Sequence, residues 1–192
     1  MRYFLILISS ALLFSCKNAS HENPHVLIET GMGDIELELY PSKAPKTVAA
    51  FVANIKAGIY DKGSFYWVLK ADELPSDFNT GIIQGGTWDL SAGEKPVAAI
   101  PHESTKQSGL SHTDGTISMA RTDTGTARTE FFICVGDQTM LDFGNNGTKD
   151  GQGFAAFGKV LNGMPVVKKI HNQPSTGDRF SKVISINRIS VE

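Results

Sequence analysis

The stretch Ile82-Ile83-Gln84-Gly85-Gly86 contains one of the short apolar segments that decide the expected fold. The segments of this kind are residues 65–69, 82–85, 116–120, 131–135 and 155–160, and long connections rich in Gly, Asp and Asn separate them. Many short strands with turn residues between them are typical of a closed antiparallel barrel. We therefore predict that the central part of the chain forms such a barrel.

The flanking segments complete this mainly β fold. Residues 26–39 have the pattern of a hairpin, because apolar residues alternate with Glu in its second half. Apolar residues at helical spacing predict one helix over residues 45–57 and a second over residues 165–173. Residues 182–191 have the pattern of a closing strand. The expected architecture is a closed antiparallel β-barrel capped by two helices.

The N-terminus has the features of a secretory signal. Arg2 is followed by a run of roughly a dozen apolar residues, which is too short to span a bilayer comfortably. A Leu, a variable residue, a small residue and then Cys16 resemble the bacterial lipobox, in which the signal peptide is removed and the Cys becomes the lipid-carrying N-terminus. The alternative is an ordinary signal peptide followed by a chance Cys.

These features predict three parts of the chain. Residues 1–15 are expected to be a lipoprotein signal peptide, residues 16–24 the lipidated Cys16 with a polar tether, and residues 25–192 one folded domain. The protein is then a membrane-anchored lipoprotein of the bacterial cell envelope, on its periplasmic or surface side. With Cys16 lipidated, Cys134 is the remaining thiol, and its apolar surroundings in the sequence predict a buried structural Cys.

Composition excludes several classes of function. The chain is 41% hydrophobic and 20% charged, which is average for a globular domain. Loss of Arg2 with the signal leaves 17 Lys and Arg against 20 Asp and Glu, a formal charge of −3. A weakly acidic chain lacks the excess of basic residues that is typical of nucleic-acid-binding proteins. The 5 His residues show no metal-ligand spacing, and we expect neither a metal nor a cofactor.

The order and spacing of residues 82–86, 118–133 and 154–160 resemble the cyclophilin family of peptidyl-prolyl isomerases. The resemblance covers roughly residues 26–191, and it implies a cyclophilin-like barrel that binds proline-containing polypeptide segments. Isomerisation of an X-Pro bond crosses a barrier of about 18–20 kcal/mol and needs no covalent group. It needs an apolar pocket for the proline ring, polar groups for the flanking backbone and a donor aimed at the prolyl nitrogen.

The resemblance also assigns roles to individual residues. Phe132 matches the aromatic pocket floor, Gln84 the amide that holds the substrate backbone, and Leu141 the residue that closes the pocket, while Phe131 is expected to point inward. The other positions expected to contact substrate are Met119, Ala120, Arg121, Glu130, Met140 and Phe154. Phe78, in the long segment of residues 70–80, is a candidate for the pocket aromatic that precedes the glutamine motif.

Trp67 stands at the catalytic position where the family has an Arg. Indole has one neutral N–H donor, whereas guanidinium has five donors and a permanent charge. If that donor contributes a few kcal/mol to the transition state, its loss lowers the rate by about two to three orders of magnitude. Arg121 or Arg128 could supply a guanidinium instead, and the alternative is that both are solvated loop residues.

Three further positions depart from the family pattern. Glu130 replaces a glutamine, Met140 a tryptophan and Phe154 a histidine. The tryptophan contacts cyclosporin-type inhibitors in the family, so weak inhibitor binding is expected here.

The favoured function is peptidyl-prolyl cis-trans isomerisation during folding of exported proteins, because slow prolyl isomerisation limits the folding of many chains. The position of Trp67 leaves open whether the activity is full or reduced. Two other functions remain open. A proline-peptide binding module or chaperone would keep the pocket without catalysis, and a structural envelope protein would tolerate replacement of Phe132 and Gln84 without any change in peptide binding.

Overall fold

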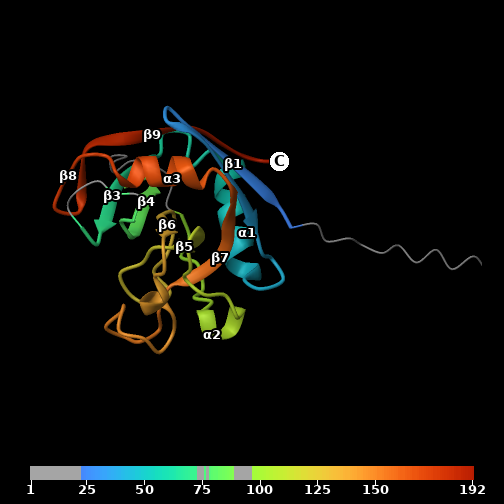
Figure 1. Cartoon of the computed structure of the whole chain (residues 1–192). Helices are drawn as coiled ribbons and strands as arrows, with labels where there is room; N and C mark the ends of the chain where they lie inside the picture. The colour runs from blue at the N-terminus through green and yellow to red at the C-terminus, as the bar shows by residue number, and fades with distance from the viewer. Residues whose placement is uncertain (1–22, 73–75, 77, 89–96) are drawn as a thin grey trace, which may run out of the picture.

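A computed structural model describes residues 23–72, 76, 78–88 and 97–192 (Figure 1). The predicted signal peptide and Cys16 therefore lie outside the described residues. In the described ranges, no helix combines the length and the apolar character that crossing a membrane requires.

Antiparallel strands form one closed sheet, in the order β1-β2-β7-β5-β6-β4-β3-β9, with β1 paired to β9 to complete the circle. The short strand β8 pairs only with β9 and lies beside this barrel. The strands are β1 (His25–Thr30), β2 (Gly33–Leu39), β3 (Ser64–Lys70), β4 (Gly81–Gly86), β5 (Thr116–Met119), β6 (Phe131–Val135), β7 (Ala155–Asn162), β8 (Ser175–Thr176) and β9 (Arg179–Val191). The prediction of a closed antiparallel barrel is confirmed.

Both predicted helices are present. Helix α1 (Pro45–Lys56) packs against β7 and β9, and α3 (Met164–His171) packs against β2, β4 and β6. The sequence analysis did not predict two shorter elements, α2 (Thr105–Ser108) and the 3-10 helix η1 (Thr139–Leu141). Single turns of this length carry too little apolar periodicity to be detected.

The first turn of α1 is capped by a distant carboxylate. Its own N-cap residue makes no side-chain hydrogen bond. Instead, Glu103 accepts hydrogen bonds from the backbone N–H of Thr47 at 2.8 Å and of Lys46 at 3.2 Å. A negative charge at a helix N-terminus satisfies orphan donors and complements the helix dipole. Glu103 therefore ties the segment before α2 to the first turn of α1.

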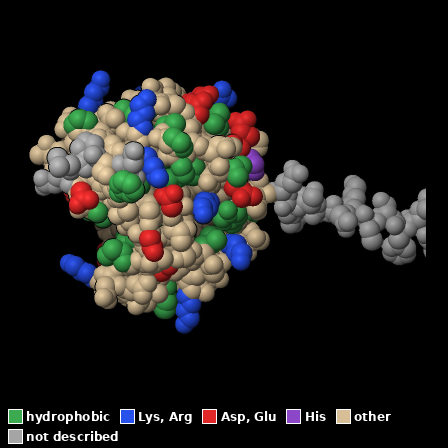
Figure 2. All heavy atoms as spheres, viewed as in Figure 1, with side chains coloured by type: hydrophobic (Ala, Val, Ile, Leu, Met, Phe, Trp, Pro, Cys, Tyr) green, Lys and Arg blue, Asp and Glu red, His purple; other side chains and the backbone are tan. Residues whose placement is uncertain are grey.

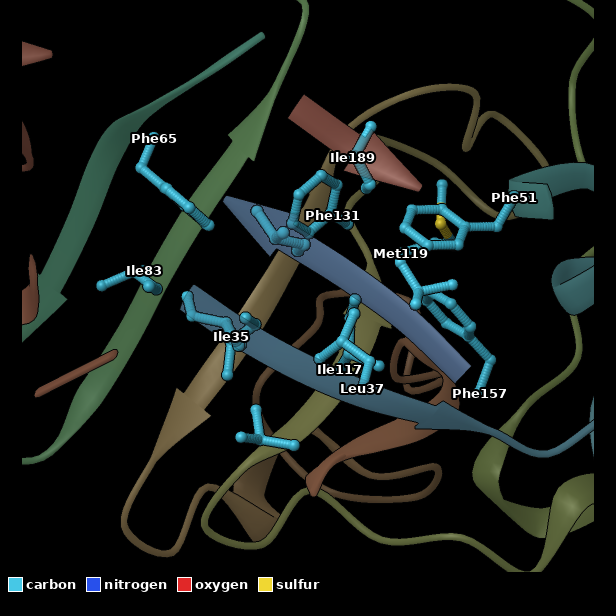
Figure 3. Close-up of a cluster of buried hydrophobic side chains, with 14 of the residues drawn as sticks. Ile35, Leu37, Phe51, Phe65, Ile83, Ile117, Met119, Phe131, Phe157 and Ile189 are labelled. Atoms are coloured by element: carbon cyan, nitrogen blue, oxygen red, sulfur yellow. The ribbon is translucent and has the colours of Figure 1, made fainter. Parts of the chain in front are cut away.

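The barrel interior is filled by aliphatic and aromatic side chains from almost every strand (Figure 3). Phe51 of α1 reaches into it, with its ring 5.6 Å from the centroid of Phe131 and 5.0 Å from that of Phe157. Phe131 points inward, as expected, and is fully buried. Cys134 is also fully buried, but on the other face of β6, and burial raises the pKa of its thiol. On the face shown in Figure 2, acidic and basic side chains are interspersed.

We predict that Phe131→Ala lowers the free energy of unfolding by about 3–5 kcal/mol, because it leaves a large cavity among buried rings. Urea unfolding followed by circular dichroism measures this change. Phe78→Ala is the matched control, since the Phe78 side chain is 92% exposed and its removal should leave stability nearly unchanged. A loss below about 1 kcal/mol for Phe131→Ala would contradict the observed packing.

Candidate functional site

A row of paired residues crosses the outer face of the sheet. Arg179 of β9 pairs with Trp67 of β3, Trp67 with Gln84 of β4, Gln84 with Phe132 of β6, and Phe132 with Ser118 of β5. Directly opposed residues of antiparallel strands project from the same face. We call this outer face of the strands β9, β3, β4, β6 and β5 the site face.

A second apolar cluster, separate from the barrel core, lies on the site face. We call it the Phe132 cluster; its buried members are Ile82, Phe132, Cys134 and Leu141, and its partly buried members are Trp67, Ala120 and Phe154. The Phe154 ring meets the Phe132 ring edge to face, at 5.2 Å between centroids. Edge-to-face packing is a favourable arrangement for aromatic rings. Five of its members, Trp67, Ala120, Phe132, Leu141 and Phe154, were assigned to one site by the sequence analysis, and the structure adds Ile82 and Cys134.

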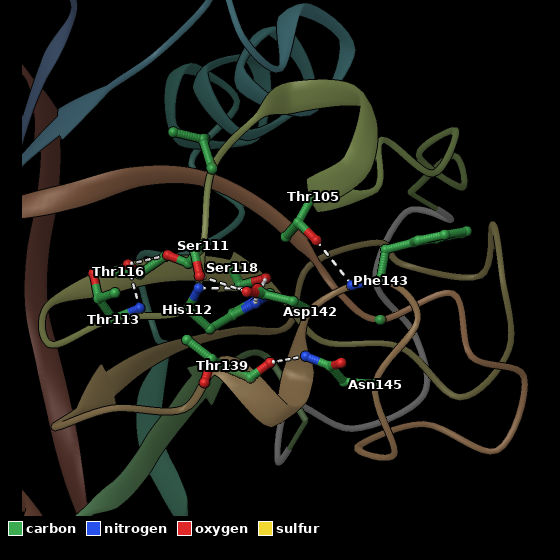
Figure 4. A network of polar contacts seen from close by, with 12 residues as sticks. Thr105, Ser111, His112, Thr113, Thr116, Ser118, Thr139, Asp142, Phe143 and Asn145 are labelled. Carbon is green, nitrogen blue, oxygen red and sulfur yellow. Dashed lines mark hydrogen bonds and ion pairs between the residues drawn. The ribbon is translucent and has the colours of Figure 1, made fainter.

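Phe132 is supported from below by a buried imidazole. The His112 ring is stacked on the Phe132 ring, at 5.8 Å between centroids. Its Nδ1 lies 2.5 Å from the Asp142 carboxylate and its Nε2 lies 3.0 Å from the Ser118 hydroxyl (Figure 4). With the carboxylate as acceptor, Nδ1–H is the donor, so Nε2 of the neutral ring accepts from Ser118. Ser111 donates to the other oxygen of Asp142.

This Ser118–His112–Asp142 chain has the connectivity of a nucleophile, base and carboxylate, but it cannot attack a substrate. Ser118 and His112 have no exposed surface, and the Phe132 cluster covers them. The network instead fixes the position of the rings, and it anchors Asp142, which directly follows Leu141. The sequence analysis missed it, because its members are 6 and 30 residues apart and form no local motif.

A polar group borders the Phe132 cluster on β3 and β4. The Tyr66 hydroxyl donates to Glu130 at 2.6 Å and accepts from the Gln84 amide at 2.7 Å. Burial and the neighbouring Glu130 carboxylate raise the pKa of Tyr66 well above its usual value. The amide oxygen of Gln84 accepts no hydrogen bond from any described residue, and the Gln84 side chain is only partly buried. Gln84 is therefore oriented and still able to bind a peptide backbone.

Glu130 is held on all sides and positions Tyr66. Its carboxylate also accepts from the backbone N–H of Thr87 at 2.9 Å and from the Thr129 hydroxyl at 3.0 Å. Gly86 allows this approach: its φ is +148°, and a Cβ there would lie 2.4 Å from the carboxylate. Glu130 was predicted to contact substrate, but these contacts make its main role the support of Tyr66 and Gln84.

A β-bulge explains how Tyr66 and Trp67 can both reach the site face. The register of β3 against β4 shifts between Phe65 and Trp67, so that Tyr66 is left without its own partner. A bulge of this kind re-aims side chains. Phe65 points into the core, Tyr66 bonds to Gln84, and the Trp67 indole packs against the Phe132 cluster. Trp67 thus adds apolar surface to the site face.

Several sequence-based assignments need correction. Met119 was predicted to line the pocket, but it is 1% exposed and packs in the barrel core (Figure 3). Side chains alternate along a strand, so Met119 must point inward when Ser118 points to the site face. Phe78 is not part of the Phe132 cluster and lies exposed. Met140 stays a predicted substrate contact, because its side chain is 55% exposed on η1, next to Leu141.

Arg121 and Arg128 both bind groups outside the Phe132 cluster. Arg121 forms a two-pronged ion pair with Asp150, at 2.8 and 2.9 Å, and also donates to the carbonyl of Gly153. This guanidinium holds the pKa of the Asp150 carboxyl well below its usual range. The central carbon of the Arg121 guanidinium lies 5.3 Å from the ring centroid of Phe154, so Arg121 also packs against that ring. Arg128 donates to the carbonyl of Val97.

Comparisons with known proteins point to one family. The family model for "Cyclophilin type peptidyl-prolyl cis-trans isomerase/CLD" matches residues 25–191. A peptidyl-prolyl cis-trans isomerase of Acinetobacter baylyi is 37% identical over 155 residues, which are 80% of this chain and 75% of the relative. Peptidyl-prolyl cis-trans isomerase B of Escherichia coli is 34% identical over 146 residues, which are 76% of this chain and 82% of the relative.

A solved structure agrees with this result. It is the crystal structure of a cyclophilin-type peptidyl-prolyl cis-trans isomerase of Cryptosporidium parvum in the presence of the dipeptide Ala-Pro. The likeness has a TM-score of 0.68 and 25% sequence identity, and it covers 88% of this chain and 98% of that one.

The buried histidines should make stability depend on pH. Burial lowers the pKa of His112, against the opposing effect of Asp142, and burial also lowers the pKa of His171. Unfolded His has a pKa of about 6.5, so the unfolded chain binds protons before the folded one does. We predict that the two histidines make their whole contribution to the free energy of unfolding above about pH 6.5, and that this contribution is lost as the pH decreases below that value.

Urea unfolding at pH 7.5 and pH 5.5 measures this effect. The double variant His112→Gln, His171→Gln should show a smaller difference between the two pH values than the native chain, whatever its absolute stability. An unchanged difference would assign the pH dependence to other groups.

Proposed function

This chain belongs to the family of cyclophilin-type peptidyl-prolyl cis-trans isomerases and is an enzyme of that type, and we propose that it isomerises X-Pro bonds of exported polypeptides at a reduced rate. The observation that carries the proposal is the Phe132 cluster beside the oriented amide of Gln84. This arrangement provides an apolar surface for a proline ring next to a hydrogen-bonding group for the flanking backbone.

The reaction needs only these non-covalent contacts. With the proline ring against the Phe132 cluster, Gln84 holds the backbone of the substrate in place, and the peptide bond can rotate between its planar forms. Catalysis requires that these groups bind the twisted bond more strongly than either planar form. The aromatic floor is rigid, because His112 is stacked on Phe132 and is itself bonded at both ring nitrogens.

The reduced rate follows from Trp67. Its side chain packs into the Phe132 cluster and has one neutral N–H donor. A neutral donor forms a hydrogen bond about half as strong as that of a guanidinium. The same apolar contribution favours a second function, in which the domain binds proline-containing segments as a chaperone with little catalysis.

We further propose that the domain works at a bacterial membrane through a lipid on Cys16, with exported chains as its clients. Residues 17–24 separate this Cys from β1, which begins at His25. Eight residues can extend over at most about 28 Å. A tether of this length would keep the barrel close to the membrane surface, where exported chains begin to fold.

We predict that the soluble domain, from Lys17 onward, accelerates cis-trans exchange of an Ala-Pro peptide in NMR exchange spectroscopy. Phe132→Ala should lower this exchange at least tenfold, because the proline ring loses its floor. Phe78→Ala, which removes an exposed Phe of the same size, should leave it unchanged. Trp67→Arg should raise exchange by about tenfold, as expected for a stronger donor. Binding without exchange in the native chain would support the chaperone instead.

Lipidation gives a separate test. In a bacterial host fed with radiolabelled palmitate, the full-length chain should take up the label and appear in the membrane fraction. Cys16→Ser should lose both properties, since the lipid is attached at that thiol. Label retained in Cys16→Ser, or absent from the native chain, would contradict the proposed anchor.

A further inference from the structure

Arg179 is a charged residue at the edge of the site face that the family resemblance did not assign. It begins β9 and pairs with Trp67, which lies in the Phe132 cluster. The backbone bond from Val68 N–H to the carbonyl of Asp178, at 2.9 Å, holds this end of β9 against β3. The side chain of Arg179 therefore projects from the same face as Trp67 and Gln84.

Two aromatic rings hold the Arg179 guanidinium in place. Its central carbon lies 5.5 Å from the ring centroid of Tyr66 and 5.4 Å from that of Trp88. The two rings are themselves stacked, at 6.3 Å between centroids and 22° between planes. A cation within about 6 Å of an aromatic ring is attracted to its face. Because the Tyr66 hydroxyl bonds to Gln84, the guanidinium is positioned relative to the peptide-binding amide.

The charge of Arg179 is not neutralised within the described part of the chain. No hydrogen bond or ion pair among those residues involves its guanidinium. Arg121, by contrast, is paired with Asp150, and the Glu130 carboxylate is occupied by Tyr66 and Thr87. Arg179 is also exposed. Its five N–H donors can therefore meet a group supplied by a bound peptide.

The distance from Arg179 to Gln84 indicates which part of a peptide it would meet. Two strand spacings separate β9 from β4, which is about 10 Å. An extended peptide advances about 3.3 Å per residue. A peptide whose proline lies against the Phe132 cluster can thus bring a side chain two or three residues from the proline to Arg179.

We propose that Arg179 is a specificity-determining residue that selects substrates with an Asp or Glu two or three residues from the proline. A carboxylate is the group that matches the planar fork of a guanidinium. The proposal rests on the isomerase function proposed above and names a substrate class for it: acidic proline-containing segments. It uses Arg179 for binding, so the residue needs no contact with the rotating bond.

A set of peptides tests the proposal. Each has one proline in an otherwise neutral sequence, with Glu, Gln or Lys at a single position up to three residues on either side. For the native domain, kcat/KM for exchange should be about two- to fivefold higher for Glu than for Gln at one of these positions, the range expected for an exposed ion pair. The preference should decrease with added salt.

Variants of the two β9 arginines complete the test. Arg179→Gln should abolish the preference, and Arg179→Glu should reverse it in favour of Lys. Arg188→Gln is the matched control, since Arg188 is an exposed arginine of the same strand that pairs with Glu29 of β1 and not with Trp67 of β3. It should leave the preference intact.

Three results would overturn the proposal. The first is an equal exchange rate for the Glu and Gln peptides, and the second is a preference for Glu that survives in Arg179→Gln. The third is an equal decrease of the exchange rate on all peptides in Arg179→Gln, which would assign Arg179 to the catalytic step. Peptide binding, measured by chemical-shift titration, should show the same order of affinities. If no peptide is exchanged, the isomerase function fails, and the order of affinities still decides whether Arg179 selects acidic segments.

Discussion

The register of the antiparallel strands β9, β3, β4, β6 and β5 is the constraint on which the rest of this structure depends. Side chains alternate between the two faces of a strand, so each strand supplies the barrel core with one set and the site face with the other. Ile83, Ile133 and Ile117 fill the core, while Gln84, Phe132 and Ser118 lie opposite. A shift of one residue in any pair would exchange the two sets and destroy the core and the site together.

The site face is completed by segments that are not part of the sheet. His112 is stacked on Phe132, Leu141 arrives on η1, and Arg121 fixes Phe154 through its contacts with the connection that precedes β7. Buried polar groups are stable only when they are fully hydrogen-bonded, and the network around Asp142 meets this requirement. The aromatic surface is thereby held rigid by polar contacts that no substrate touches.

The groups around Gln84 combine apolar surface with charge. Trp67 supplies apolar surface, and Glu130 supplies a carboxylate that is satisfied within the protein. The bulge at β3 brings Tyr66 between Gln84 and Glu130, and Arg179 lies beside the Tyr66 ring. The polar arrangement around Gln84 therefore depends on the bulge that places Tyr66.

The sequence by itself determined the barrel and both main helices, because apolar alternation and helical spacing are local patterns. It also predicted that Phe131 points inward and that Cys134 is buried. Only the tertiary structure decided that Met119 is core, that Arg121 is held by Asp150, and that His112 supports Phe132. It likewise brought Arg179 to Tyr66 from a strand 113 residues further along the chain. Such contacts depend on which strands pair and where a bulge shifts the register, and no local pattern encodes the partner of a side chain across the sheet.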